Sequence, residues 1–336
     1  MELNEILNAL HYTGRVFSDK NDAELLIAMH KAYVANPWFT PENIALSVNY
    51  WSKKLTPESL QQWIEREQIG NNPAPKTVGI IAAGNIPLVG LHDILSVLIT
   101  GNRAIIKPSS EDEALIQFFI ATMVQANPEM ANYLQTTERI EKLEAVIATG
   151  SNNTARYFEY YFGKYPNVIR KNRNSIAVLT GDESPETLTK IAGDITGYFG
   201  KGCRNVTQVW MPKGFDIVKF IDNTLPYSDL INHNKYANNY VYHRALFLMN
   251  MDTHLDNGFM LFREDKKIYA PIGTVNYTFY DDLSDVKAFI AEHTEEIQCV
   301  VSEADLGNVV APGETQNPAL WDYADGVNTI EFLKGI

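Results

Sequence analysis

The chain of 336 residues contains two cysteines, and one of them, Cys203, stands in a segment whose neighbours suit a nucleophile. The segment from Phe199 to Asn205 reads Phe-Gly-Lys-Gly-Cys-Arg-Asn. Its glycines let a reacting group approach the backbone, and Lys201 and Arg204 place positive charge on both sides of the thiol. Because positive charge favours the reactive thiolate, the pattern predicts a catalytic cysteine. A small buried hydrophobic residue is the alternative interpretation.

Three other polar segments each follow a short apolar run that has the character of a buried strand. They are Gly84-Asn85-Ile86-Pro87 after 77–83, Lys107-Pro108-Ser109-Ser110 after 103–106, and Thr149-Gly150-Ser151 after 145–148. Strands and helices alternate here, which predicts a parallel sheet covered on both faces. Since ligands of such sheets bind at the carboxyl ends of the strands, we expect the three segments to line one site. Each segment taken alone is more often a plain turn or helix cap.

The composition predicts a globular protein with room for two domains. Apolar residues make up 45% of the chain, and the net charge of −13 argues against a nucleic-acid partner. Its longest apolar stretch, 88–99, is interrupted by His92 and Asp93, so no membrane span is expected. The polar start at Met1–Glu5 is unlike a signal peptide, and the cysteines lie far apart in sequence. We therefore expect a cytoplasmic protein.

Taken in order, these segments resemble the motifs of the aldehyde dehydrogenase superfamily. Asn85-Ile86-Pro87 is similar to its Asn-Phe-Pro motif, and Gly101-Asn102-Arg103 with Lys107-Pro108-Ser109 is similar to its Gly-Asn and Lys-Pro-Ser motifs. Thr149-Gly150-Ser151 resembles its Thr-Gly-Ser motif. Gly200–Cys203 resembles its Gly-Gln-x-Cys motif, and Tyr269–Ile272 resembles its Phe-Gly-Pro-Val motif. This likeness covers residues 75–280. Within the superfamily, Gly202–Val206 and the tail Asp322–Val327 resemble the LuxC-type fatty acyl-CoA reductases of bacterial luminescence.

The resemblance implies an α/β fold with a helical N-terminus and two parallel or mixed sheet domains. We expect a helical segment 1–70, a Rossmann-like NADP-binding domain 71–182, a catalytic domain 183–316 and a tail 317–336. Within the helical segment, Thr40-Pro41-Glu42 and Thr56-Pro57-Glu58 each predict a helix start, because they offer an N-cap, a proline in the first turn and an early acid. The tail ends in a predicted strand, which returns to the first domain or pairs with another subunit. A homodimer or higher homo-oligomer is expected from the superfamily.

The resemblance also assigns roles to individual residues. Cys203 becomes the nucleophile, and the side-chain amide of Asn85 joins the backbone N–H of Cys203 as the oxyanion hole. Contacts with a nicotinamide dinucleotide are implied for Lys107, Ser109, Ser110, Thr149, Gly150, Ser151 and Tyr269. No spacing of ligand residues indicates a metal, so no metal cofactor is expected.

A missing acid indicates which reaction to expect. Hydrolytic members of the superfamily carry a water-activating Glu in a Glu-Leu-Gly-Gly-Lys motif, but residues 163–181 contain neither Asp nor Glu. A thioacyl-enzyme would then persist until a thiol or a hydride resolves it, which favours a thioester reductase. The same stretch is basic at Arg170, Lys171 and Arg173, which either meet phosphates of coenzyme A or the nucleotide, or form a solvated loop face.

Two further differences from the superfamily pattern concern the cofactor. Ser110 stands where NAD-preferring members carry a Glu that would repel a 2′-phosphate, and Glu111 follows one residue later. This favours NADP(H) over NAD(H). The Glu-x-Phe clamp on the nicotinamide ribose is replaced by Lys267-Ile268-Tyr269, in which the tyrosine can pack on the ribose but the lysine cannot accept its hydroxyl protons.

We therefore predict the NADPH-dependent reduction of an acyl-CoA thioester to an aldehyde through a thioacyl-enzyme on Cys203. Two alternatives stay open: an acyl-phosphate reductase of the same superfamily, and a non-catalytic nucleotide-binding subunit, which Lys267 and the short chain would favour. The histidines 92, 233 and 243 lack a partner pattern and are predicted to be structural. Cys299 is predicted to be the core residue of a strand.

Overall fold

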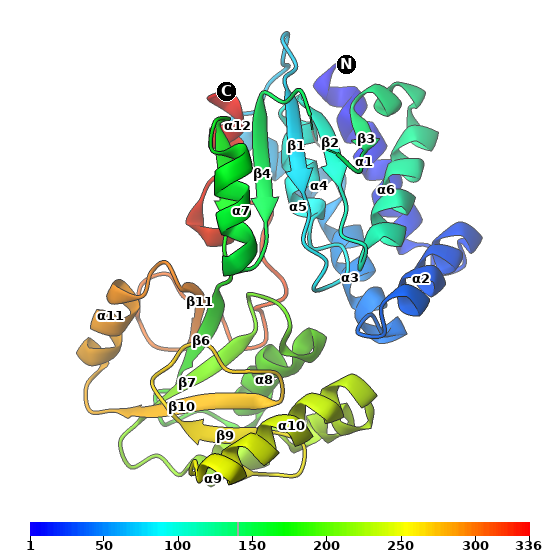
Figure 1. Ribbon diagram of the computed structural model, residues 1–336. Helices are drawn as coiled ribbons and strands as arrows, with labels where there is room; N and C mark the ends of the chain where they lie inside the picture. Colours follow the sequence, from blue (N-terminus) through cyan, green and yellow to red (C-terminus); the bar gives the residue numbers. More distant parts are fainter. Residues whose placement is uncertain (140) are drawn as a thin grey trace. The chain divides into compact units, whose positions relative to one another are not determined.

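The structure is a computed structural model that describes residues 1–139 and 141–336. The chain forms two compact units, here called the first unit (Met1–Asn172 with Ala319–Ile336) and the second unit (Arg173–Pro318) (Figure 1). Each unit is built on its own sheet with helices, which confirms the predicted α/β class. Within the described ranges, no helix has both the length and the apolar character needed to cross a membrane.

The first unit begins with the predicted helical segment. Its helices are α1 (Leu3–Ser18), α2 (Ala23–Ala35), α3 (Pro41–Lys54) and α4 (Pro57–Glu67). The hydroxyls of Thr40 and Thr56 accept hydrogen bonds from the N–H groups of Asn43 and Ser59, and a proline follows each threonine. These caps satisfy amide groups that have no partner inside a helix, so the two helix starts predicted from Thr-Pro-Glu are confirmed.

The first sheet has the strand order β3-β2-β1-β4-β5, and every pairing in it is parallel. Its strands are β1 (Thr77–Ile81), β2 (Arg103–Lys107), β3 (Leu134–Thr136), β4 (Ala145–Thr149) and β5 (Asn167–Arg170). The helices α5 (Leu91–Ile99), α6 (Glu113–Ala126) and α7 (Asn152–Phe162) connect them, with the 3-10 helix η1 (Pro128–Asn132) before β3. The order reverses between β1 and β4, which is the switch point where such sheets bind ligands.

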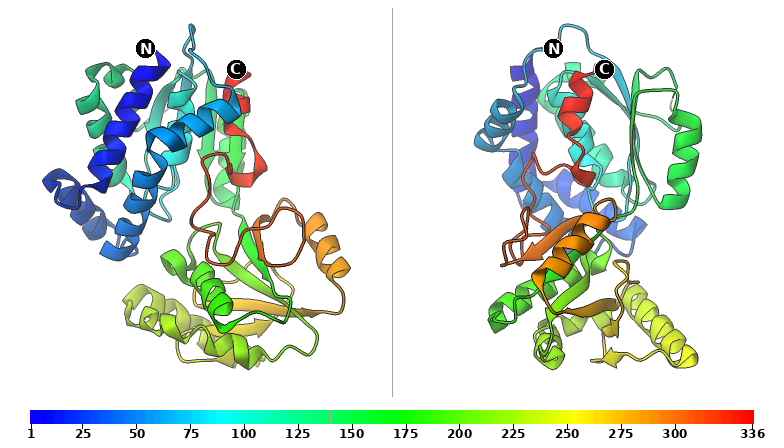
Figure 2. Two further views of the ribbon diagram at one scale, coloured as in Figure 1. Left: turned by 180° about the vertical axis from the view of Figure 1, so that it is seen from behind. Right: turned by 90° about the vertical axis from the view of Figure 1, so that its left-hand side faces the viewer.

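Helices cover both faces of the first sheet, as a parallel sheet requires. Figure 2 shows α7 on one face and the N-terminal helices on the other. On the α7 face, Val146 and Ala148 pack near Phe158, whereas Val78 and Ile80 belong to the larger core on the opposite face. Consecutive strand residues thus point to opposite cores, and only the strand ends are left for polar chemistry.

The predicted strand at the end of the chain is wrong, because Thr329–Lys334 forms helix α12. Asn328 caps this helix by accepting a hydrogen bond from the N–H of Glu331. Ile330 and Leu333 are buried at helical spacing in the core of the first unit, to which residues 319–336 belong. The N-cap and this spacing outweigh the strand propensity of the Val-Asn-Thr-Ile sequence. The short 3-10 helix η4 (Ala324–Gly326) precedes it.

A buried ion pair links β5, α5 and α12. The Arg170 guanidinium donates to both carboxylate oxygens of Asp93 at 2.6 and 2.5 Å and to the hydroxyl of Thr329 at 2.8 Å. Arg170 is 5% exposed, so the expectation that it meets phosphates or solvent is wrong. Its neighbour Lys171 does lie on the exposed surface, where it pairs with Glu159.

Aromatic packing beside this ion pair holds the C-terminal segment. The ring of His92 lies 5.5 Å from those of both Trp63 and Tyr323, and its Nε2 is 2.8 Å from the carbonyl oxygen of Leu320. The indole N–H of Trp63 donates to the Tyr323 hydroxyl at 2.8 Å. Burial lowers the pKa of His92, so the neutral ring is favoured in the folded state. His92 is structural, as the sequence indicated.

The second sheet has the order β11-β6-β7-β10-β9-β8, with only the β8–β9 pairing antiparallel. Its strands are β6 (Asn174–Val178), β7 (Val206–Pro212), β8 (Leu255–Asp256), β9 (Leu261–Glu264), β10 (Thr274–Tyr280) and β11 (Ile297–Ser302). The helices are α8 (Pro185–Thr196), η2 (Gly197–Gly200), α9 (Ile217–Asp222), η3 (Leu225–Asn232), α10 (Asn234–Asn250) and α11 (Leu283–Glu292). Strand β6 belongs to this second sheet, although residues 174–178 fall within the range 71–182 that was expected to form the NADP-binding domain.

The Arg170–Asp93 pair yields a stability prediction. Replacing Asp93 by Ala leaves a buried guanidinium without its counter-charge, so we expect the free energy of unfolding to fall by about 3–5 kcal/mol. Urea denaturation followed by circular dichroism measures this change. Glu159→Ala breaks the exposed pair with Lys171 in the same unit and is expected to leave stability nearly unchanged. Equal effects of the two substitutions would contradict the structural role given to the buried pair.

Candidate functional site

Cys203 is half-buried and lies in the turn between η2 and β7. Three successive residues before this turn, Tyr198, Phe199 and Gly200, have φ angles of 49°, 59° and 74°. Glycine adopts this left-handed region freely, but the two aromatic residues pay a steric cost there. Such strain persists only where the surrounding contacts impose it, and it concentrates at functional turns.

Asn205 supplies the main contacts that impose this turn. Its side chain is fully buried, and its Oδ1 accepts a hydrogen bond from the N–H of Gly202 at 2.7 Å. Its Nδ2 donates to the carbonyl oxygens of Asp194 at 2.9 Å and Gly197 at 2.8 Å. One amide group thus joins the end of α8 to the residue that precedes Cys203, which fixes the backbone at the start of the Cys203 turn.

A second polar network orients Arg204. The buried Asp194 carboxylate accepts hydrogen bonds from the N–H of Gly313 at 2.7 Å and from the N–H and hydroxyl of Thr315 at 3.1 and 2.7 Å. Burial raises the pKa of Asp194, and these hydrogen bonds oppose the rise. The Thr315 carbonyl in turn accepts a 2.5 Å hydrogen bond from Nε of Arg204. The Arg204 side chain, which follows Cys203 in sequence, is therefore held in one direction.

The second cysteine lies close to the same turn. The buried Ser175 hydroxyl in β6 donates to the Cys203 carbonyl at 3.1 Å and lies 2.9 Å from Sγ of Cys299 in β11. Cys299 is in a strand, as predicted, but it is only half-buried and not a core residue. Ser175 therefore gives the backbone of Cys203 a further support.

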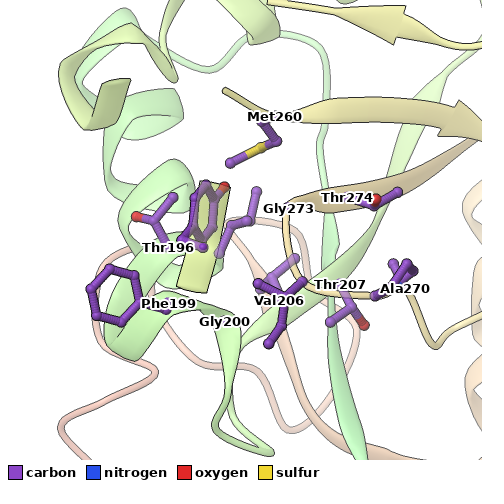
Figure 3. A pocket seen from close by; sticks show the side chains of 13 residues that line it. Thr196, Phe199, Gly200, Val206, Thr207, Met260, Ala270, Gly273 and Thr274 are labelled. Atoms are coloured by element: carbon purple, nitrogen blue, oxygen red, sulfur yellow. The ribbon is translucent and has the colours of Figure 1, made fainter. Parts of the chain in front are cut away.

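A small cavity adjoins the residues before Cys203 (Figure 3). Thr196, Phe199 and Gly200 line one side of it, and the segment from Ala270 to Thr274 lines another. Its volume of about 20 Å³ has room for about one water molecule and is far below that of a ligand pocket. The buried Thr274 hydroxyl finds no hydrogen-bond partner within the described residues, which suits a water site. The cavity is too small to hold an acyl chain.

Tyr269 projects from a segment that is held by buried polar groups. The Asn276 side chain donates to the carbonyl oxygens of Lys267 at 2.8 Å and Tyr269 at 2.9 Å, and the Thr207 hydroxyl donates to that of Ile268 at 2.6 Å. The ring of Tyr269 is 67% exposed. A hollow of about 500 Å³ lies beside it, lined by residues 265–269 and the end of α11. The ring is thus accessible to a planar or sugar-like ligand.

The first unit carries the remaining candidate residues at the carboxyl edge of its sheet. Asn85 lies in the loop after β1, Lys107 ends β2, and Thr149 ends β4. Ser109 and Ser110 follow β2, and Gly150 and Ser151 follow β4. The first two loops touch, because a Cβ on Gly84 would lie 2.4 Å from Oγ of Ser109. Glycine is required at this close approach.

This edge fits a dinucleotide in its donor groups. The side chains of Lys107 and Ser110 are exposed there, and the Ser151 hydroxyl caps α7 by accepting from the N–H of Thr154 at 3.2 Å. A helix N-terminus and a lysine are both suited to phosphate. Glu111, also exposed, is the acid nearest to Ser110 in sequence. Nowhere in 1–139 and 141–336 do His, Cys, Asp and Glu residues gather as a metal site.

Several residues that support these loops have no recognisable pattern in the sequence. Asn205 was part of the quoted motif, but its structural role was not predicted, and Asp194, Ser175, Asn276 and Thr207 were missed. Asp194, Ser175 and Thr207 act through hydrogen bonds to backbone groups that are distant in sequence, and such bonds leave no local pattern. The Nδ1 atom of the predicted structural residue His233 accepts from the N–H of Tyr236, which makes it the N-cap of α10.

Comparison with known proteins agrees with this architecture. A NAD-dependent aldehyde dehydrogenase structure from Sinorhizobium meliloti matches 96% of this chain and 72% of its own, with a TM-score of 0.68 and 11% identity. The long-chain acyl-protein thioester reductase of Aliivibrio fischeri is 21% identical over 244 residues, which cover 62% of this chain and 50% of the relative. The enzyme of the same name from Photobacterium phosphoreum is 28% identical over 143 residues, 36% of this chain and 29% of its own.

The fold is therefore that of the aldehyde dehydrogenases, with two α/β sheet units and a helical N-terminal region. The family model described as acyl-CoA reductase (LuxC) matches residues 2–218, and the chain belongs to this family. Both expectations drawn from the sequence motifs are confirmed. The chain spans about half, or less, of the length of the curated relatives it matches.

The buried side-chain amide of Asn205 provides a direct test of the geometry of the Cys203 turn. Asn205→Ala leaves the Gly202 N–H and two carbonyl groups unsatisfied, so we expect the free energy of unfolding to fall by about 1–3 kcal/mol. Thermal denaturation followed by circular dichroism measures it. Asn232→Ala, which removes an exposed hydrogen bond to Asp229 in the same unit, is the control. If both variants melted like the wild type, Asn205 would not be the support described above.

Proposed function

We propose that the protein reduces an acyl thioester to an aldehyde through a thioacyl-enzyme on Cys203. The observation that carries the proposal is the turn that presents Cys203, because the buried side chains of Asn205 and Ser175 bond to its backbone and the Arg204 side chain ties it to Thr315. A thiol that merely filled space would not need this support. Membership of the acyl-CoA reductase family, and relatives named as acyl-protein thioester reductases, support the reaction class.

The proposed reaction begins with attack of the Cys203 thiolate on the thioester carbonyl carbon. The carrier thiol leaves, and the acyl group stays on Sγ. The Asn85 amide and the Cys203 N–H are proposed to donate to the carbonyl oxygen while it carries negative charge. No acid occurs among residues 163–181 to activate a water molecule, so hydrolysis of the acyl-enzyme is disfavoured. After reduction, the thiohemiacetal on Sγ collapses to the aldehyde and frees Cys203.

A nicotinamide dinucleotide, when bound, supplies the hydride for this reduction. We propose that Lys107, Ser109 and Ser110 hold its adenosine end, that residues 149–151 contact its phosphates, and that Tyr269 packs on the nicotinamide ribose. The exposed side chains of Lys107 and Ser110 at the strand ends support the first assignment. A serine at position 110 has no negative charge to repel a 2′-phosphate, so NADPH is the proposed reductant.

The thioester carrier is proposed to be coenzyme A, and a protein-bound acyl group is the competing substrate. Membership of the acyl-CoA reductase family favours coenzyme A, whereas the names of the two relatives, acyl-protein thioester reductases, favour a protein-bound acyl group. Acyl phosphate would also acylate Cys203 and differs only in its leaving group. A non-catalytic nucleotide-binding subunit is the rival from another class, and it predicts NADPH binding without consumption of any thioester.

The two cysteines can be told apart by substitution. Cys203→Ala removes the nucleophile, so we expect aldehyde formation from acyl-CoA and NADPH to fall by at least about 1,000-fold. Cys299→Ala is the matched control and is expected to retain most of the activity, because its thiol lies beside Ser175 and not in the turn. NADPH oxidation and aldehyde trapping are measured together. Undiminished turnover by Cys203→Ala would refute the proposal.

Cofactor choice is tested at Ser110. Ser110→Glu places a carboxylate beside the proposed position of the 2′-phosphate, so we expect the affinity for NADPH to fall roughly tenfold or more while that for NADH is kept. Fluorescence titration with both nucleotides gives the ratio of dissociation constants. Ser110→Gln has similar size without charge and serves as control. An unchanged ratio in Ser110→Glu would show that position 110 does not face the 2′-phosphate.

A further inference from the structure

Asp112 is the N-cap residue of α6, but its side chain does not cap that helix. Elsewhere in the chain, Asp22, Ser184 and Asp282 occupy the same position and each accepts a hydrogen bond from its own helix. An N-cap aspartate normally gains stability in this way. The exception at Asp112 therefore indicates that its carboxyl group serves another part of the molecule.

The carboxyl group instead binds the loop that carries Asn85. Its Oδ2 accepts a 2.7 Å hydrogen bond from the N–H of Leu88, which has a left-handed φ of 57°. The preceding carbonyl, that of Pro87, accepts a 2.7 Å hydrogen bond from the buried Ser47 hydroxyl of α3. Two buried side chains from different helices thus hold one strained corner, three residues after Asn85.

The cost of burying this carboxyl group is large enough to call for an explanation. Asp112 is 2% exposed, and its Oδ1 has no hydrogen-bond partner among the residues that the structure describes. Unsatisfied buried polar atoms are rare in folded proteins, and they tend to occur where a function requires them. Burial also raises the pKa of Asp112 well above its usual range. The single bond to Leu88 does not require a charged acceptor.

The same aspartate also ends the loop proposed to hold the cofactor. The N–H of Asp112 donates to the Ser109 carbonyl at 3.0 Å, so the residue closes the turn that follows Lys107. Gly84, in the loop of Asn85, also lies against Ser109, because a Cβ at position 84 would meet the Ser109 side chain. Asp112 thus bonds to both loops through its own backbone and side chain, and a shift in one is transmitted to the other.

We propose that Asp112 is a positioning residue, which sets the place of Asn85 through the Leu88 N–H and so governs acylation of Cys203. This inference rests on the proposed function, because it assigns Asn85 to the oxyanion of the acylation step. Misplacement of such a donor by about 1 Å costs on the order of 100-fold in rate, and loss of one costs 100- to 1,000-fold. The carboxyl group itself touches neither substrate nor cofactor in this account.

The test compares Asp112→Ala with Asp112→Asn, whose side-chain oxygen can still accept from Leu88. Rapid-quench intact mass spectrometry measures the rate of Cys203 acylation by an acyl-CoA without nucleotide, and fluorescence measures the NADPH dissociation constant. We expect acylation to be roughly 10- to 100-fold slower in Asp112→Ala and close to the wild-type rate in Asp112→Asn. In Asp112→Ala the NADPH dissociation constant should change by a smaller factor than the acylation rate. Asp22→Ala, an N-cap substitution in the same unit, is expected to acylate like wild type.

A readout that does not need activity keeps the inference separate from the proposed function. Hydrogen exchange of the Leu88 amide should accelerate in Asp112→Ala and not in Asp112→Asn. If Asp112→Ala does not fold, Ser47→Ala replaces it as the test variant. Ser47→Ala removes the hydrogen bond from α3 to the Pro87 carbonyl, so it should also slow acylation. The inference would be overturned if Asp112→Ala acylated at the wild-type rate, or if acylation slowed as much in Asp112→Asn as in Asp112→Ala. Absence of any adduct in the wild type would instead refute the proposed function, and an unchanged Leu88 exchange would then overturn the positioning role.

Discussion

Parallel hydrogen bonding of β1 to both β2 and β4 is the constraint from which the first unit's organisation follows. Strands that run in one direction bring their carboxyl ends to one edge, and helices must then cover both faces. The residues in the middle of each strand consequently pack against these helices. The polar loops that begin near Asn85, Lys107 and Thr149 lie at the remaining free edge, beside the switch point between β1 and β4.

In both units, the loops that carry the candidate site residues depend on hydrogen bonds from buried polar side chains. Asn205 holds the turn of Cys203, Asn276 holds the segment of Tyr269, and Asp112 holds the corner after Asn85. Each replaces hydrogen bonds that an irregular backbone would otherwise make with water. A buried side chain that binds backbone atoms also permits left-handed angles at residues such as Phe199. The exposed residues can therefore be held in one geometry without regular secondary structure.

Local patterns in the sequence predicted the parts of the fold that arise from local physics. Apolar runs ended by polar motifs located β1, β2 and β4, and the Thr-Pro-Glu triplets located α3 and α4. Long-range choices were not predictable in this way. The run 176–179 does not reveal which sheet it joins, the tail's apolar residues fit a strand as well as α12, and nothing near Arg170 marks its pairing with Asp93. The candidate nucleophile was identified from its neighbours, whereas its supporting residues required the structure.

We propose that the thiol of Cys203 carries the acyl group during the reaction. Intact-protein mass spectrometry tests this role, after the protein is mixed with acyl-CoAs of different chain length, first without NADPH and then with it. We predict an added acyl mass that maps to Cys203 and disappears as NADPH is oxidised and aldehyde appears. A protein that binds NADPH but gains no acyl mass from any acyl-CoA, acyl-protein or acyl phosphate would contradict it.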